Sequence, residues 1–298
     1  MLMRLAPVIF VLLWSTGFIG SKLGAPDAEP FTFLSLRFLI VLAILFPVLL
    51  VTGRRARGWR ERGHSMVVGM LIHGTYLGGV FWSIRHGMPS GVAALIVSLQ
   101  PILTSLLSAP LLGERLAARH WIGLALGFAG ALLILEPGLA RAFDADSGIT
   151  ATNVAACLVA LVAITASTIY QKRFAAGTDM LAGTVWQYVG AVLLAGAGSF
   201  LFETQTVHWT PKFIFALGWL VLVLSIGAIF LLMLMIRQNA VASVSGLFYL
   251  VPACTAVIAF FMFDETLSPL QLAGLALATV AVLMISGAKW PRRPAKAS

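Results

Sequence analysis

The chain has 298 residues, of which 60% are apolar and 10% are charged, and its formal net charge is +9. A soluble domain carries about a quarter charged residues and about half apolar ones, so this composition excludes an ordinary soluble protein and indicates a polytopic membrane protein. The cations lie in short loops between apolar runs, which argues against nucleic-acid binding. Cys157 and Cys254 lie inside apolar runs, so we expect buried thiols there, and neither a disulfide nor a metal site.

Ten apolar runs approach the length of about 20 residues that a transmembrane helix needs. The predicted helices cover residues 5–23, 31–51, 66–84, 90–112, 118–135, 152–171, 179–202, 213–236, 241–263 and 269–287. The first run follows Arg4, as the apolar part of a signal peptide would. Its length and its counterpart in the second half of the chain favour a retained helix. The predicted fold class is therefore an all-α polytopic membrane protein.

The second half of the chain repeats the plan of the first. An offset of 151 residues relates Pro101 to Pro252 and Glu114 to Glu265, and upstream segments match at offsets of 150 to 152. Such self-similarity predicts two structural repeats. We expect one five-helix repeat in residues 1–147 and another in residues 148–298.

Because five is an odd number, the second repeat must enter the membrane from the opposite side. With the N-terminus placed inside, fifteen of the 20 lysines and arginines fall in inside segments and four in outside segments, and Arg37 lies within a helix. This imbalance follows the positive-inside rule. The sequence therefore predicts inverted repeats in a multi-pass protein of the cytoplasmic (inner) membrane, with both termini cytoplasmic and a basic C-terminal tail.

Each half combines a proline in its fourth helix, a Gly-Glu or Asp-Glu turn and a glycine-rich fifth helix. In these features, and above all in the segment Leu112-Gly113-Glu114-Arg115-Leu116, the chain resembles the EamA-type transporters of the drug/metabolite transporter superfamily. The second copy departs from the motif, with Asp264 in place of the glycine. The resemblance implies ten helices around a central cavity and export of small metabolites, often amino acids.

Inverted repeats place a substrate site near the bilayer midplane, between the two halves. Small and polar residues at helical spacing in the fourth and ninth helices predict the faces that line this cavity: Gly91, Ala94, Ser98, Pro101, Ser105, Ser108, Ser245, Tyr249, Pro252, Ala256 and Ala259. Each proline either frees a backbone carbonyl one turn earlier for the substrate or simply kinks its helix.

Three polar residues within the second and third helices have two interpretations each. His73 and Tyr76 lie one turn apart and either form a polar wall of the cavity or, for His73, pair with a neighbouring helix. His73 is also the only residue well inside the predicted spans that titrates near neutral pH. Arg37 either binds a substrate carboxylate or extends outward to Asp27 or Glu29, and the outward interpretation is favoured.

Aromatic and amide residues complete the candidate site, which also includes Thr16. Trp14 and Trp186 either stack on a ligand or anchor the protein at the membrane surface, and the mid-helix position of Trp14 fits anchoring poorly. Gln187 is the repeat counterpart of Arg37, so the two halves differ chemically there. The glutamates of the two turns, at helix ends, are expected to act in turns and caps.

Several motifs are absent. No carboxylate lies at mid-membrane, and the chain has no GxxxxGK[ST], HExxH or GxSxG segment. We therefore expect no cofactor, no metal site, no enzyme activity and no implied ATPase subunit.

The expected function is export of small metabolites across the lipid bilayer, with amino acids, including aromatic ones, as the first class. The expected mechanism is alternating access by rocking of the halves, without ion coupling. The alternatives are export of drug-like cations or other metabolites, with or without proton coupling, and a membrane scaffold that transports nothing.

Overall fold

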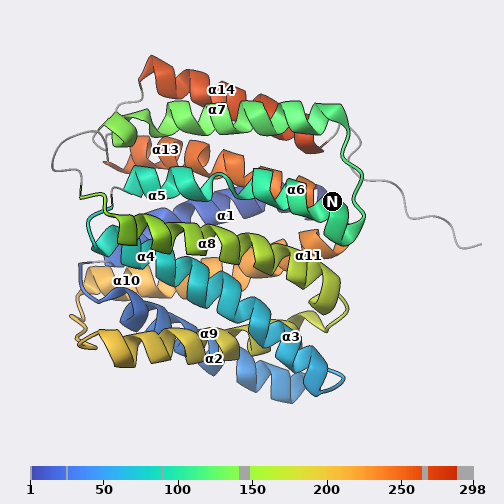
Figure 1. Ribbon diagram of the computed structural model, residues 1–298. Coiled ribbons are helices and arrows are strands. Elements are labelled where there is room, and N and C mark those ends of the chain that lie inside the picture. The colour runs from blue at the N-terminus through green and yellow to red at the C-terminus, as the bar shows by residue number, and fades with distance from the viewer. Residues whose placement is uncertain (1, 25, 89, 141–147, 264–267, 287–298) are drawn as a thin grey trace, which may run out of the picture.

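A computed structural model of the chain describes residues 2–24, 26–88, 90–140, 148–263 and 268–286. In these segments all regular structure is helical, apart from one isolated bridge between Ala28 and Val207. The helices lie side by side and alternate in direction, so they form one bundle whose loops gather at its two ends (Figure 1). The beginning of the first helix and the end of the last one lie at the same end of this bundle.

The helices follow in chain order, with short π-helical or 3-10 segments marked η. They are α1 (Leu2–Gly24), α2 (Pro30–Thr52), α3 (Trp59–Gly69), η1 (Met70–Leu77), α4 (Gly78–Arg85), α5 (Ser90–Val97), α6 (Gln100–Leu112), α7 (Ala118–Ala140), α8 (Ala151–Tyr170), η3 (Gln171–Ala175), α9 (Met180–Phe202), α10 (Pro211–Trp219), η4 (Leu220–Ala228), α11 (Ile229–Gln238), α12 (Val241–Gly246), η5 (Leu247–Tyr249), α13 (Leu250–Phe263) and α14 (Pro269–Ser286).

Seven helical stretches in the described part of the chain are long and apolar enough to cross a membrane. They are Pro30–Thr52, Trp59–Arg85, Val92–Leu112, Ala118–Glu136, Ala151–Ala175, Met180–Phe202 and Pro211–Gln238. Three shorter apolar helices cover Leu5–Gly17, Val241–Thr255 and Pro269–Ile285. The prediction of an all-α polytopic membrane protein is therefore confirmed, and the count of ten crossings stays a prediction.

Two of the predicted helices are not continuous. The run 90–112 is divided into α5 and α6, and the run 241–263 is divided into α12, η5 and α13. Pro101 and Pro252 lie in the first turn of the helix that follows each break. The cause is the proline ring, which lacks an amide hydrogen and collides with the carbonyl one turn earlier. The third predicted helix also begins earlier than expected, at Trp59 and not at residue 66. Its first residues are polar, so the hydropathy of the sequence does not reveal them.

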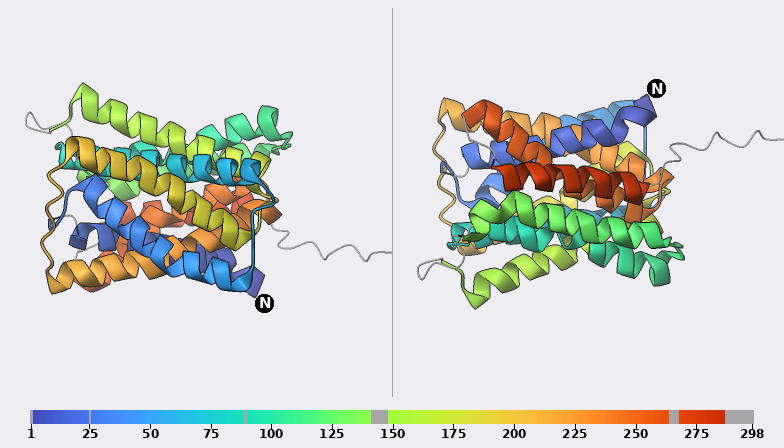
Figure 2. Two further views of the ribbon diagram at one scale, coloured as in Figure 1. Left: turned by 90° about the horizontal axis from the view of Figure 1, so that it is seen from below. Right: turned by 90° about the horizontal axis from the view of Figure 1, so that it is seen from above.

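Irregular segments recur at the spacing of the sequence repeat. The π-helical segments η1 and η4 begin at Met70 and Leu220, 150 residues apart, within the third predicted helix of each half. Contacts between the halves are also reciprocal. Helix α2 packs against α9, and α7 packs against α14. Helix α1 contacts η4 and α13, while α8 contacts η1, α5 and α6. Figure 2 shows α7 and α14 side by side along one face of the bundle.

Glycines allow two helix pairs, α7 with α14 and α3 with α9, to approach closely. A Cβ atom added at Gly130 would lie 2.9 Å from the carbonyl oxygen of Gly274, and one added at Gly274 would lie 2.8 Å from that of Gly130. A Cβ at Gly190 would collide with the backbone of Met66 in α3. Close packing of this kind stabilises helix pairs in lipid, where packing replaces the hydrophobic driving force.

Replacing Gly190 by valine is expected to destabilise the protein, because the backbone of Met66 cannot move aside as a flexible side chain can. Overpacking costs about 1–3 kcal/mol, which corresponds to a fall of roughly 2–10 °C in the midpoint of thermal unfolding. Gly196 lies in the same helix with nothing within 4 Å of an added Cβ, so Gly196→Val is the matched control. Equal midpoints for the two purified variants would contradict this packing.

Candidate functional site

A cavity of about 70 Å³ lies between the two halves of the chain, and we call it the larger cavity. Its lining comes from α1, η1, α4, α5, the break between α5 and α6, the start of α6, α8, η5 and α13. The lining residues are Trp14, Tyr76, Val80, Ile84, Ala93, Ala94, Val97, Ser98, Gln100, Ile164, Phe248, Val251 and Pro252. Four predicted site residues, Trp14, Tyr76, Ser98 and Pro252, are thus brought together from four separate predicted helices.

One wall of the larger cavity is aromatic. The rings of Trp14 and Phe248 have centroids 5.3 Å apart and an interplanar angle of 83°. Phe10 packs on both, at 5.2 Å from Trp14 and 5.5 Å from Phe248. Edge-to-face contacts of this kind hold aromatic rings in a defined orientation. Trp14 therefore belongs to a fixed aromatic wall in the interior and is not an anchor at the membrane surface.

The two helix breaks bring polar backbone groups to the larger cavity. Pro101 and Pro252 have no amide hydrogen to bond the carbonyls of Val97 and Phe248, four residues earlier, and both of these residues line the cavity. Helices α6 and α13 begin at the breaks, and a helix N-terminus carries a partial positive charge. The breaks thus place the N-terminal ends of two half-helices beside the cavity.

Gln100 is a residue of this site that the sequence analysis did not select. Its side chain is 1% exposed and lines the larger cavity. Its Nε2 donates to Oγ1 of Thr104 at 3.0 Å, while its Oε1 has no described hydrogen-bond partner. An unsatisfied buried acceptor costs about 1–3 kcal/mol, so this oxygen is suited to a ligand that donates a hydrogen bond. A polar residue directly before the proline of an apolar helix was the available signal.

Some predicted site residues lie away from the larger cavity. Thr16 accepts a hydrogen bond from Nε1 of Trp219 at 3.0 Å. The ring of Trp186 lies 5.3 Å from the guanidinium of Arg62, near the start of α3, which is a contact typical of a surface anchor. Tyr249 is fully buried, with its ring against Gly127 and its hydroxyl without a described partner. These side chains hold helices together and are not part of the cavity lining.

Only part of the small and polar face predicted in the fourth helix lines the larger cavity. Ser98 reaches the larger cavity, and Pro101 is buried in the first turn of α6. Ser105 lies farther along, where its Oγ is 3.1 Å from Nε2 of His120 in α7. The side chains of Gly91, Ala256 and Ala259, also predicted for these faces, lie outside the described residues. The cavity therefore takes only the part of the face next to the break.

Arg37 points into the protein, so its predicted outward orientation is wrong. It is 4% exposed, and its Nε donates to Oγ of Ser225 at 2.8 Å. The two acids toward which Arg37 was expected to extend, Asp27 and Glu29, have other hydrogen-bond partners. Glu29 accepts hydrogen bonds from the hydroxyl and amide of Thr204, and these bonds lower the pKa of Glu29 below its usual value. Arg37 is directed inward because the buried hydroxyl of Ser225, on η4 in the other half of the chain, accepts a hydrogen bond from its guanidinium.

His73 belongs to the same buried region as Arg37. Its ring stacks on Tyr188, with centroids 4.6 Å apart and an interplanar angle of 18°, and the Tyr188 hydroxyl donates to the carbonyl of Ser225 at 2.6 Å. His73 is 2% exposed and its Nε2 has no described partner. Among the described residues it lines neither cavity, and its contact with the neighbouring helix α9 is this ring stacking.

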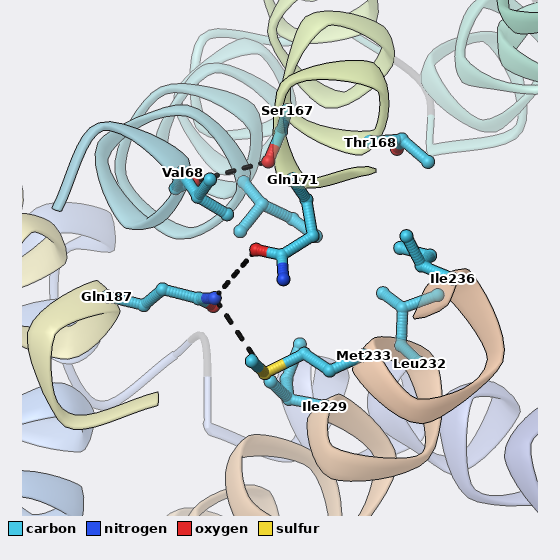
Figure 3. Close-up of a pocket in the computed structure, with 10 residues that line it drawn as sticks. Val68, Ser167, Thr168, Gln171, Gln187, Ile229, Leu232, Met233 and Ile236 are labelled. Carbon is cyan, nitrogen blue, oxygen red and sulfur yellow. Dashed lines mark hydrogen bonds between the residues drawn. The ribbon is translucent and has the colours of Figure 1, made fainter. Parts of the chain in front are cut away.

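A second, smaller cavity of about 20 Å³ contains Gln187 (Figure 3). Its Nε2 donates to Oε1 of Gln171 at 3.0 Å and to Sδ of Met233 at 3.7 Å. The full lining is Val68, Ile72, Ser167, Thr168, Gln171, Gln187, Ile229, Leu232, Met233 and Ile236. The sequence singled out Gln187, and its partner Gln171 was missed.

The glutamate of the Leu-Gly-Glu turn closes one end of the bundle. Glu114 accepts hydrogen bonds from the backbone amides of Val241 at 2.7 Å and Ala242 at 3.2 Å, at the start of α12. Beside it, Nζ of Lys172 donates to the carbonyls of Ile236 at 2.7 Å and Asn239 at 3.0 Å. The capping role predicted for Glu114 is confirmed, although the capped helix belongs to the other half. Glu265 lies outside the described residues.

The membrane-length apolar helices define a polytopic helical membrane protein, and a cavity lies between its two halves. In the described part of the chain no group of three or more His, Cys, Asp or Glu residues could hold a metal ion. The model of the EamA-like transporter family matches residues 2–136 and 152–287. The chain therefore belongs to the EamA-like transporter family, and it is a membrane transporter.

Several curated proteins are similar over nearly their full length. The "Uncharacterized inner membrane transporter YedA" of Escherichia coli (strain K12) is 25% identical, covering 95% of this chain and 90% of that protein. The "Probable amino-acid metabolite efflux pump" of the same strain is 24% identical (95% and 94% covered). The "Probable terminal-alkyne amino-acid exporter" of Streptantibioticus cattleyicolor is 29% identical (97% and 94% covered). A solved crystal structure shares the fold, with a TM-score of 0.78 at 20% identity, covering 95% of this chain and 97% of the other.

Proposed function

We propose that this transporter exports amino acids, including aromatic ones, across the inner membrane. In this proposal ten transmembrane helices form two inverted repeats, residues 1–147 and 148–298, with both termini in the cytoplasm. The observation that carries the proposal is the larger cavity, which joins an aromatic wall to the unpaired side-chain oxygen of Gln100 between the two halves. The recurring breaks and reciprocal helix contacts support the repeat.

The larger cavity suits a zwitterion with an apolar side chain. The ammonium group of an amino acid requires acceptors, and Oε1 of Gln100 supplies one that has no described partner. The carboxylate is favoured by the N-termini of the half-helices α6 and α13. An aromatic side chain packs on the wall around Trp14. The printed names of two relatives, one for amino-acid metabolite efflux and one for amino-acid export, support the same substrate class.

The size of the larger cavity indicates how the transporter works. A volume of about 70 Å³ holds a few water molecules, because each needs about 10–15 Å³ by this measure. An amino acid enters only when the two halves separate on one side. We infer alternating access by rocking of the halves, and a facilitated process, since no carboxylate lies within the larger cavity to carry a proton.

Export of drug-like cations is the second candidate function. Its supporting observation is the free acceptor of Gln100 in a cavity that no cationic side chain lines. In that version a proton gradient drives export, and His73 is the candidate relay because of its position in the buried region. A scaffold without transport requires a filled centre, and the larger cavity between the halves argues against it.

The test is uptake of radiolabelled amino acids into liposomes that hold the purified protein, with and without an imposed pH gradient. Saturable uptake of phenylalanine without a gradient is the expected result. A steep dependence on the pH gradient that survives His73→Ala would contradict uncoupled transport. Uptake of a cationic dye in place of every amino acid would favour the second candidate function and reject the first.

A further inference from the structure

The smaller cavity lies beyond the larger one along the same helices. On the helical stretch Trp59–Arg85, Val68 and Ile72 line the smaller cavity, and Tyr76 lines the larger one at the next turn. On α8, Ile164 lines the larger cavity, and Ser167 and Thr168, about one turn later, line the smaller one. Helix α8 runs toward the end of the bundle that Glu114 closes, so the smaller cavity lies between the larger cavity and that end (Figure 1).

The hydrogen bonds of the smaller cavity leave one buried donor free, the side-chain nitrogen of Gln171. Oε1 of Gln171 accepts from Gln187, whose Nε2 is also directed at the sulfur of Met233. The hydroxyls of Ser167 and Thr168 donate to the backbone carbonyls of Val68 and Ile164, so they offer no further hydrogen. Nε2 of Gln171 has no described partner, although Gln171 is only 2% exposed. Figure 3 shows this nitrogen pointing into the space between the Gln187, Met233 and Ile236 side chains.

We propose that the smaller cavity is a second substrate subsite, in which Nε2 of Gln171 donates a hydrogen bond to the carboxylate of the amino acid. This inference rests on the proposed function and adds a second position on the path. The ligand class follows from the lining. The free amide hydrogens require an acceptor, and the isoleucine, leucine and methionine side chains require an apolar group beside it.

The substrate occupies this subsite during one step of the transport cycle only. Its volume of about 20 Å³ holds one water molecule, so the substrate reaches it only when the end closed by Glu114 opens. A water molecule there would satisfy the free amide until the carboxylate replaces it. The subsite therefore belongs to the state that is open at the Glu114 end, which gives it an effect on one side of the membrane only.

The experiment measures exchange of radiolabelled phenylalanine in vesicles of both orientations, with the full-length wild type and Gln171→Met. Methionine is close to glutamine in size but donates no hydrogen bond. Since a hydrogen bond to a charged group is worth about 1.5–3 kcal/mol, the half-saturating concentration should rise roughly 10–100-fold on the side of the Glu114 end. It should change by less than threefold on the other side.

Phenylalaninol, which lacks the carboxylate, separates a binding role from a structural one. In the wild type it should compete more weakly than phenylalanine on the side of the Glu114 end, and Gln171→Met should reduce this difference on that side only. An unchanged half-saturating concentration, or an equal change on both sides, would overturn the subsite while the proposed function stands. Absence of saturable wild-type exchange for any amino acid would reject the proposed function, and the subsite with it.

Discussion

Gln100→Leu is expected to raise the half-saturating concentration for amino-acid exchange about 10–100-fold. Oε1 of Gln100 is the buried acceptor without a described partner in the larger cavity, and a hydrogen bond from an ammonium group to it is worth about 1.5–3 kcal/mol. The variant should fold normally, because leucine fills a similar volume and only the bond to Thr104 is lost within the protein. Exchange of radiolabelled phenylalanine in proteoliposomes measures the effect.

The matched control is Gln238→Leu, which makes the same chemical change at an exposed position at the end of α11. This control should keep the wild-type half-saturating concentration. Wild-type values for both variants would show that Gln100 does not contact the substrate. A lower midpoint of thermal unfolding for Gln100→Leu alone would instead assign Gln100 a role in folding.

Glu114→Ala is expected to open the end of the bundle that this residue closes. The substitution removes two hydrogen bonds that the backbone amides of Val241 and Ala242 donate to the carboxylate. Bonds of this kind contribute about 1.5–3 kcal/mol each, so the population open at this end should rise at least tenfold. The measurement is the rate of maleimide labelling of Ile236→Cys in the smaller cavity, after Cys157 and Cys254 are replaced by alanine.

Glu61→Ala provides the control for this experiment. Glu61 lies in the first turn of α3, and its carboxylate accepts a bond of 2.7 Å from the amide of Arg57 just before that helix, so it does not join the halves. Labelling of the cysteine at position 236 should stay at the wild-type rate in Glu61→Ala. Equal rates in the two glutamate variants would contradict the role of Glu114 in closing this end.

Much of the fold could be predicted from the sequence because it follows from local properties. Apolar runs fix the position of membrane-length helices, and the repeat offset relates the two halves without any structural information. The helix breaks could not be located, because proline at position 101 or 252 is compatible with either a kink or a full break. The outcome depends on neighbouring helices, which a single segment does not specify.

The site was predicted in part, and the reason lies in the distance between partners along the chain. Trp14, Tyr76 and Ser98 reach the larger cavity as polar or aromatic residues on inward helix faces. The orientation of Arg37 depends on Ser225, 188 residues away, so its outward prediction failed. The importance of Gln100 also depends on an unfilled hydrogen-bonding position, which becomes visible only when the buried neighbours are known.

The central claim is that one cavity between the halves receives the substrate from each side of the membrane in turn. Labelling of Ser98→Cys with a membrane-impermeant maleimide tests it most directly, because Ser98 lines the larger cavity. The protein for this test lacks Cys157 and Cys254, and its vesicles are prepared in both orientations. Reaction from both sides, slowed on both by phenylalanine, is the result that alternating access predicts. Reaction from one side only, or no protection by phenylalanine, would contradict the account.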